Sequence, residues 1–123
     1  MLKERKPLPV IALTTDTSAL TAIGNDFGFE HIFSRQVEAL MKKKDLLISI
    51  STSGNSKNII NALKFAKSKK FKILNILGNK GGSAKNYSKK NFIVNSNNSS
   101  RVQEVHLIFY QNVCEIVENY FLK

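Results

Sequence analysis

The stretch from residue 48 to residue 56, ISISTSGNS, holds the residues whose types and spacing most clearly suggest chemistry. A short apolar run ends at Ile50, and the following residues are mostly Ser, Thr or Gly. Hydroxyl groups and the free backbone N–H groups at a helix N-terminus all donate hydrogen bonds to an anion. Gly54 lets the backbone approach a bound group closely. The pattern therefore favours a loop that binds a dianionic phosphate.

This stretch differs from the common nucleotide-binding loops. It lacks the lysine and the spacing of GxxxxGK[ST], and the dinucleotide fingerprint GxGxxG is absent. The sequence therefore indicates neither an NTPase nor a dinucleotide-binding enzyme. A simpler interpretation stays open, in which Ser53 or Asn55 only caps the helix that follows.

The elements that must position this loop follow from the hydrophobic pattern. Short apolar runs predict four buried strands, at residues 8–13, 45–51, 71–77 and 91–94. Helical spacing predicts helices at residues 19–23, 30–41, 55–69 and 100–122, with a short helical turn at 84–87. The first of these helices should begin after the N-cap types at residues 16–18 and end at Gly24 and Asn25.

Strands that alternate with helices form a parallel sheet covered on both faces. We therefore expect an α/β fold, a three-layer flavodoxin-like sandwich with a long C-terminal helix. Ligands bind such sheets at the carboxyl ends of the strands, which is where the STSGNS loop should lie. The chain has 123 residues, and we expect one domain over residues 1–123.

Composition narrows the class of partner and the compartment. The net charge is +10, but 16 of the 19 basic residues are scattered lysines, so we do not expect nucleic acid as the partner. No apolar run reaches the length of a membrane span, so we expect no membrane partner. The single cysteine, Cys114, cannot form an internal disulfide, which fits a cytoplasmic protein. Its apolar neighbours predict a buried thiol.

Three stretches of the chain carry a resemblance to a known family. In chain order they read IALTTDTSALTAIGNDFGFEHIFSRQVEAL, ISTSGNSKNIINAL and RVQEVHLI. Together they resemble the sugar isomerase (SIS) domain family, most closely its phosphoheptose isomerases, over nearly the whole chain. The resemblance implies a cytoplasmic homotetramer with an SIS-type fold. It also implies an enzyme that converts sedoheptulose 7-phosphate to D-glycero-D-manno-heptose 7-phosphate, a precursor of bacterial lipopolysaccharide.

The resemblance also implies which residues bind the substrate. It assigns phosphate binding to the STSGNS loop, sugar contact to the Asn-Asp pair of IGNDFG, and contact with both substrate and zinc to the glutamine of RVQEVH. The matching positions are Ser51, Thr52, Ser53, Ser56, Asn25, Asp26 and Gln103.

The sequence departs from the family pattern in two ways that bear on catalysis. Family members begin with a further segment that supplies a first strand, a glycine-rich loop, and a helix with a His and the Glu taken as catalytic base. The family's long helix also carries a His, used as zinc ligand and acid/base, where this chain has Gln111. An amide exchanges no proton at neutral pH and is a poor zinc ligand. We expect neither His31 nor His106 to replace it.

We therefore expect a sugar-phosphate pocket, with little isomerase activity in the chain alone and a doubtful zinc site. Three interpretations stay open: a fragment of an isomerase, a catalytically silent sugar-phosphate sensor or interaction module, and a relative of the SIS-fold protein that associates with the DnaA replication initiator. A sheet without the family's first strand should expose an edge or apolar surface and favour self-association.

Overall fold

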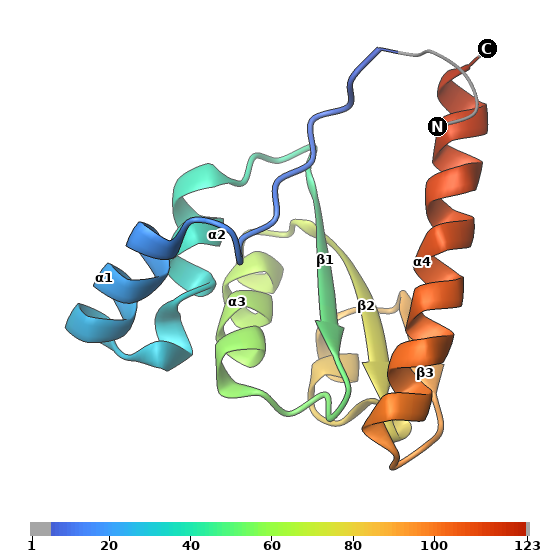
Figure 1. Cartoon of the computed structure of the whole chain (residues 1–123). Helices are drawn as coiled ribbons and strands as arrows, with labels where there is room; N and C mark the ends of the chain where they lie inside the picture. The colour runs from blue at the N-terminus through green and yellow to red at the C-terminus, as the bar shows by residue number, and fades with distance from the viewer. Residues whose placement is uncertain (1–5, 123) are drawn as a thin grey trace.

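The computed structural model describes residues 6–122, in which short helices and a parallel sheet precede one long helix (Figure 1). The helices are α1 (Thr17–Phe27), α2 (Ser34–Leu40), α3 (Lys57–Ser68) and α4 (Ser99–Phe121). The strands are β1 (Leu46–Ser51), β2 (Lys72–Gly78) and β3 (Asn91–Val94). Three short 3₁₀ turns lie at Phe29–His31, Asn79–Gly81 and Ala84–Tyr87.

The three strands form one sheet in the order β1-β2-β3, and both pairings are parallel. Ile48 pairs with Leu74 in the first ladder, and Leu77 pairs with Ile93 in the second. Helix α3 lies on one side of the sheet and α4 on the other (Figure 1). This confirms the expected α/β sandwich with a long C-terminal helix, and all three carboxyl strand ends lie at one edge.

The strand predicted at residues 8–13 was wrong. This segment has no strand geometry, and Val10 and Ile11 are 87% and 68% exposed. An apolar run becomes a strand only when a neighbouring strand takes up its backbone hydrogen bonds. In the described part of the chain β1 is an edge strand, so the sheet has three strands rather than four.

The first helix begins as predicted but ends later. The Asp16 side chain accepts a hydrogen bond from the backbone N–H of Ala19 at 2.9 Å and caps α1. The helix then continues through Gly24 to Phe27 and ends at Gly28. One glycine inside a helix costs only about 1 kcal/mol relative to alanine, which was not enough to end this one. The helix predicted at 30–41 is instead a 3₁₀ turn followed by α2.

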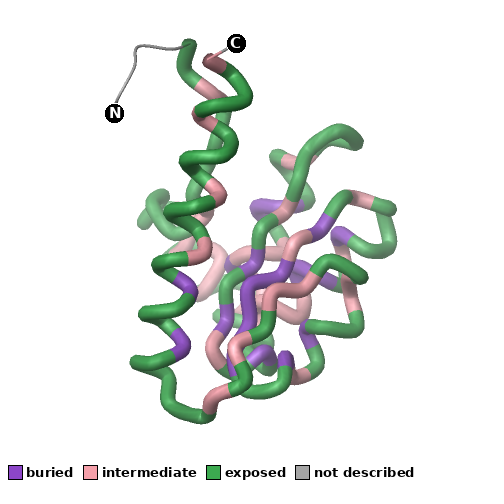
Figure 2. The backbone as a smooth tube through the Cα atoms, turned by 90° about the vertical axis from the view of Figure 1, so that its right-hand side faces the viewer, coloured by how far each residue is buried: buried purple, intermediate pink, exposed green. Residues whose placement is uncertain are grey.

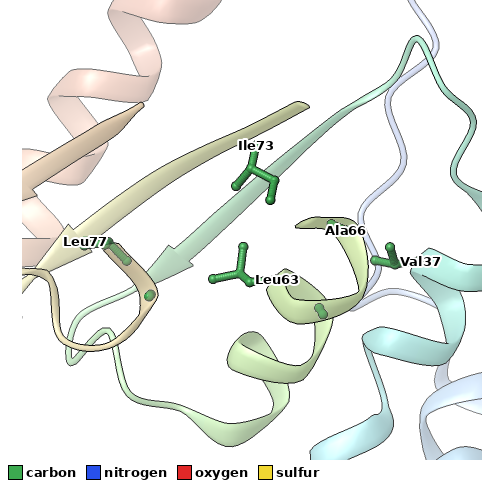
Figure 3. Packing of buried hydrophobic residues seen from close by; sticks show 7 residues of the cluster. Val37, Leu63, Ala66, Ile73 and Leu77 are labelled. Atoms are coloured by element: carbon green, nitrogen blue, oxygen red, sulfur yellow. The ribbon is translucent and has the colours of Figure 1, made fainter. Parts of the chain in front are cut away.

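The hydrophobic core lies between α3, the sheet and α2 (Figure 3). Leu63 and Ala66 lie on the apolar face of α3, and both are fully buried. They pack with Val37 of α2 and with Ile73 and Leu77 of β2. Burial of each large aliphatic side chain contributes roughly 1.5–3 kcal/mol, so this cluster fixes α3 and the loop before it against the sheet.

Helix α4 is buried only near its start. Val102 and His106 pack on the sheet, but Ile116 and Tyr120 near the C-terminal end of the helix are 68% and 70% exposed. Figure 2 shows the C-terminal turns of α4 as largely exposed. Cys114 lies on this part and is exposed, so the prediction of a buried thiol was wrong. None of the helices within residues 6–122 has the length and apolar character needed to cross a membrane.

Candidate phosphate-binding site

Residues 51–56, named here the serine loop, connect the carboxyl end of β1 to α3. The Ser51 hydroxyl oxygen accepts a hydrogen bond from the Gly54 N–H at 3.0 Å. The Ser53 hydroxyl oxygen accepts one from the Asn55 N–H at 3.1 Å. A hydroxyl that accepts one bond still has its own proton to donate. The buried Ser51 therefore shapes the loop, and the exposed Ser53 can shape it and still bind a ligand.

The loop ends at the N-terminus of α3, where Ser56 is the N-cap residue. Its side chain makes no capping hydrogen bond, although its backbone oxygen accepts from the Ile60 N–H at 2.9 Å. The Ser56 hydroxyl is exposed and lies beside the positive end of the helix dipole. This arrangement suits an anion. The interpretation in which Ser53 or Asn55 caps the helix was wrong, because neither occupies the cap position.

The start of α4 approaches the serine loop at Gly78, the last residue of β2. A Cβ atom on Gly78 would lie 2.4 Å from the Thr52 backbone oxygen and 2.8 Å from Cγ1 of Val102. Only glycine lets these two groups come so close. Gln103 follows Val102 and is exposed. The serine loop therefore lies at the carboxyl edge of the sheet, and the first turns of α4, which carry Gln103, begin at the same edge.

Asn25 and Asp26 are not at this edge. Both are exposed on α1, where the Asn25 amide donates a hydrogen bond to the Asp26 carboxylate at 2.8 Å. Helix α1 lies on the far side of α3 from β1 (Figure 1). Within one chain, therefore, the structure does not place this pair beside the serine loop.

A groove of about 480 Å³ lies beside the serine loop. Asn55 and Ser83 line it together with Lys57 and Lys64 of α3. Glu30 also lines the groove, so two ammonium groups and one carboxylate leave a net positive charge that favours an anion. A second groove, of about 560 Å³, lies between α2 and α3 and contains none of the predicted site residues. His31 is partly buried and lines that second groove.

The described residues do not fit a zinc ion. His106 is 2% exposed between α4 and the sheet, with Nε2 3.0 Å from the Leu77 backbone oxygen. Gln111 is exposed further along α4, and its amide is a poor zinc ligand. Over residues 6–122, no three His, Cys, Asp or Glu side chains lie together in a way that could hold a metal.

A second glycine-rich stretch, GNKGGS at residues 78–83, also contributes to this edge, although the sequence analysis assigned it no role. In the structure, Ser83 donates its backbone N–H to the Asn55 side chain at 2.8 Å. The available signal was its position, since GNKGGS follows the neighbouring strand at the same sheet edge. Asn55 therefore joins two loops, which its sequence context did not show.

The sequence is similar to one protein family and to curated proteins that share one name. The family model described as "SIS domain" matches residues 1–78. The chain is 54% identical over 116 residues to a phosphoheptose isomerase of Aliarcobacter butzleri, which covers 94% of this chain and 61% of the relative. It is 50% identical over 118 residues to that of Helicobacter pylori strain P12, with 96% and 62% covered.

The solved structures to which the chain is similar are also phosphoheptose isomerases. A phosphoheptose isomerase from Francisella tularensis superposes with a TM-score of 0.88 at 39% identity, over 92% of this chain and 63% of that one. One from Neisseria gonorrhoeae superposes with a TM-score of 0.84 at 44% identity, over 87% and 61%. The chain thus spans somewhat over three-fifths of the length of these relatives. Their names do not favour the replication-initiator alternative. Its sequence, its parallel-sheet fold and the family model together show that this chain belongs to the SIS domain family.

Proposed function

We propose that this chain binds a phosphorylated sugar of the sedoheptulose 7-phosphate class, with the phosphate in the serine loop. The observation that carries the proposal is the uncommitted Ser56 hydroxyl at the N-terminus of α3. Ser53 and Thr52 add hydroxyl donors next to it, and Ser51 holds the loop in shape. A charge-assisted hydrogen bond to a phosphate is roughly twice as strong as a neutral one.

The reaction that this binding serves is the isomerisation named for the relatives. A proton moves between C1 and C2 of the sugar through an enediol-like intermediate, which requires a base, an acid and stabilisation of an oxyanion. Anchoring the phosphate would fix the position of the reacting carbons. We propose that this chain supplies the anchoring, with Gln103 contacting the substrate from the start of α4.

The described residues supply no evident acid/base pair for the same reaction. Gln111 exchanges no proton at neutral pH, and His106 is buried against the sheet. We retain Asn25 and Asp26 as proposed sugar contacts, which requires α1 to meet the sugar in an assembly of copies. The chain by itself should therefore bind substrate and convert it slowly.

Calorimetry tests the binding proposal. Sedoheptulose 7-phosphate should bind the 123-residue chain saturably, and sedoheptulose, which lacks the phosphate, should bind at least 100-fold more weakly. The loss corresponds to roughly two charge-assisted hydrogen bonds. Equal affinity for the two sugars, or no binding of either, would refute the proposal.

We also propose that the chain self-associates, in keeping with the tetramer that the family resemblance implies. Leu46, Ile48 and Ile50 alternate along one face of β1, and each is about half exposed. On α4, Ile116 and Tyr120 are more than two-thirds exposed. Contiguous apolar surface of this kind marks an interaction site.

Light scattering after gel filtration should therefore give a mass well above 13.8 kDa. The double substitution Ile116→Lys and Tyr120→Lys should lower that mass, because buried ammonium groups oppose association. Asn119→Lys on the same exposed helix end is the control for added charge. A monomer at all concentrations would contradict the proposal.

A further inference from the structure

The serine loop is joined to the segment that follows β2 by two hydrogen bonds. The Ser83 N–H donates to the Asn55 side-chain oxygen at 2.8 Å, and the Ala84 N–H donates to the Gly54 backbone oxygen at 2.9 Å. Residues 78–84, named here the glycine segment, thus contact the serine loop through both a side chain and the backbone. Within the serine loop these two contacts are made by Gly54 and Asn55, which are the residues between Ser53 and Ser56.

The backbones of the serine loop and the glycine segment lie so close together that a side chain at Gly54 or Gly82 would clash with the other loop. A Cβ on Gly54 would lie 2.2 Å from the Gly81 backbone oxygen, and one on Gly82 would lie 2.6 Å from the Gly54 carbonyl carbon. Both glycines have positive φ, +66° and +51°, which other residues adopt at a cost. Together, these features specify one packing of the two loops.

The glycine segment is itself anchored to the interior of the sheet. Asn75 of β2 is completely buried, and its amide nitrogen donates to the Ala84 backbone oxygen at 3.1 Å. The Asn75 amide oxygen accepts from the Ser49 hydroxyl of β1 at 2.7 Å. A fully bonded buried polar group is costly to disrupt. Ala84 is therefore fixed by the buried Asn75, and its N–H in turn fixes the position of Gly54.

We propose that Asn55 is a positioning residue that holds the serine loop in the conformation that binds phosphate. Its side chain fixes the loop to Ser83, while its backbone N–H bonds to the Ser53 hydroxyl. The hydroxyls of Ser53 and Ser56 thus flank a residue that cannot move freely. A binding loop that is already ordered loses less entropy when the ligand binds. The effect on affinity rests on the proposed function, whereas the effect on the loop does not.

Amide hydrogen exchange in the ligand-free chain tests the effect on the loop. Asn55→Ala should accelerate exchange at the Gly54 and Ala84 amides roughly fivefold to tenfold, as expected for one lost neutral hydrogen bond. Asn55→Asp keeps the acceptor and should restore protection, but its charge should still weaken phosphate binding. Asn61→Ala is the matched control, because Asn61 lines the same groove and bonds instead to the Glu30 backbone.

A double-mutant cycle identifies the partner of Asn55. Ser83→Pro removes the donor N–H, and the φ of Ser83, −73°, is compatible with proline. Adding Asn55→Ala to Ser83→Pro should change exchange no further. Unchanged exchange in Asn55→Ala alone overturns the proposal even if the proline variant does not fold. If the double variant folds and the two substitutions accelerate amide exchange additively, the proposal is overturned as well. Failure of the wild-type chain to bind sedoheptulose 7-phosphate would overturn the proposed function and leave the exchange result standing.

Discussion

Replacing Ser53 and Ser56 together with alanine is expected to weaken binding of sedoheptulose 7-phosphate at least about 100-fold. Each hydroxyl donates one hydrogen bond to a charged phosphate in the proposed complex, and such a bond contributes roughly 1.5–3 kcal/mol. Two lost bonds correspond to roughly a 100-fold to 10,000-fold change in the dissociation constant. Calorimetry on both chains measures this change.

The control for this experiment is Ser68→Ala. Ser68 ends α3 at the opposite end from Ser56, and its hydroxyl bonds to the Phe65 backbone oxygen. This variant should bind the sugar phosphate like the wild type. If the double variant kept the wild-type affinity, the phosphate would have to bind elsewhere, and the assignment of the serine loop would be wrong.

The 123-residue chain is expected to convert sedoheptulose 7-phosphate at least about 100-fold more slowly than the Aliarcobacter butzleri relative. General acid–base catalysis contributes roughly 100-fold to 10,000-fold to such a reaction. Gln111 stands where the family resemblance implies a proton-transferring His, and His106 bonds to Leu77 inside the fold. A coupled assay for the aldose product measures both proteins at saturating substrate.

Contamination by the isomerase of the expression host is the main confounding source of turnover. The Ser53→Ala, Ser56→Ala double variant, purified in the same way, gives the background to subtract. Turnover within tenfold of the relative, absent from the double variant, would contradict this expectation and show that the chain has an acid/base pair of its own.

Local patterns predicted the elements next to the site well. Strand β3 and the turn at Ala84–Tyr87 have the predicted bounds, and β1 begins only one residue late. The two strands are short apolar runs between polar turn residues, which is the pattern that identifies a buried strand. The position of the serine loop followed from the rule that ligands bind at the carboxyl edge of a parallel sheet.

The failed predictions concern apolar residues whose burial depends on packing against other parts of the structure rather than on the local sequence. Residues 8–13 are as apolar as β1 but have no strand beside them, so they form no strand, and Val10 and Ile11 stay exposed. The stripe of α4 has helical spacing throughout, yet only its first turns meet the sheet. Periodicity identifies an apolar face, but it does not identify the surface that covers it. Cys114 was assigned wrongly for the same reason.

The role of Asn55 could not be predicted, because its partner lies 28 residues away in the chain. Asn before a helix usually indicates a cap, and only the three-dimensional packing of Gly54 on Gly82 brings Ser83 within reach. The same holds for Asn75, a polar residue inside an apolar strand whose three partners come from other elements.

Titration of isotope-labelled chain with sedoheptulose 7-phosphate, followed by NMR, tests most directly where the phosphate binds. Phosphate binding by the serine loop should give saturable shifts of the Ser53, Gly54 and Ser56 amides and of the first turn of α3, with smaller shifts at Gln103. Shifts confined to the groove between α2 and α3, or no saturable shift at residues 51–58, would contradict phosphate binding by the serine loop.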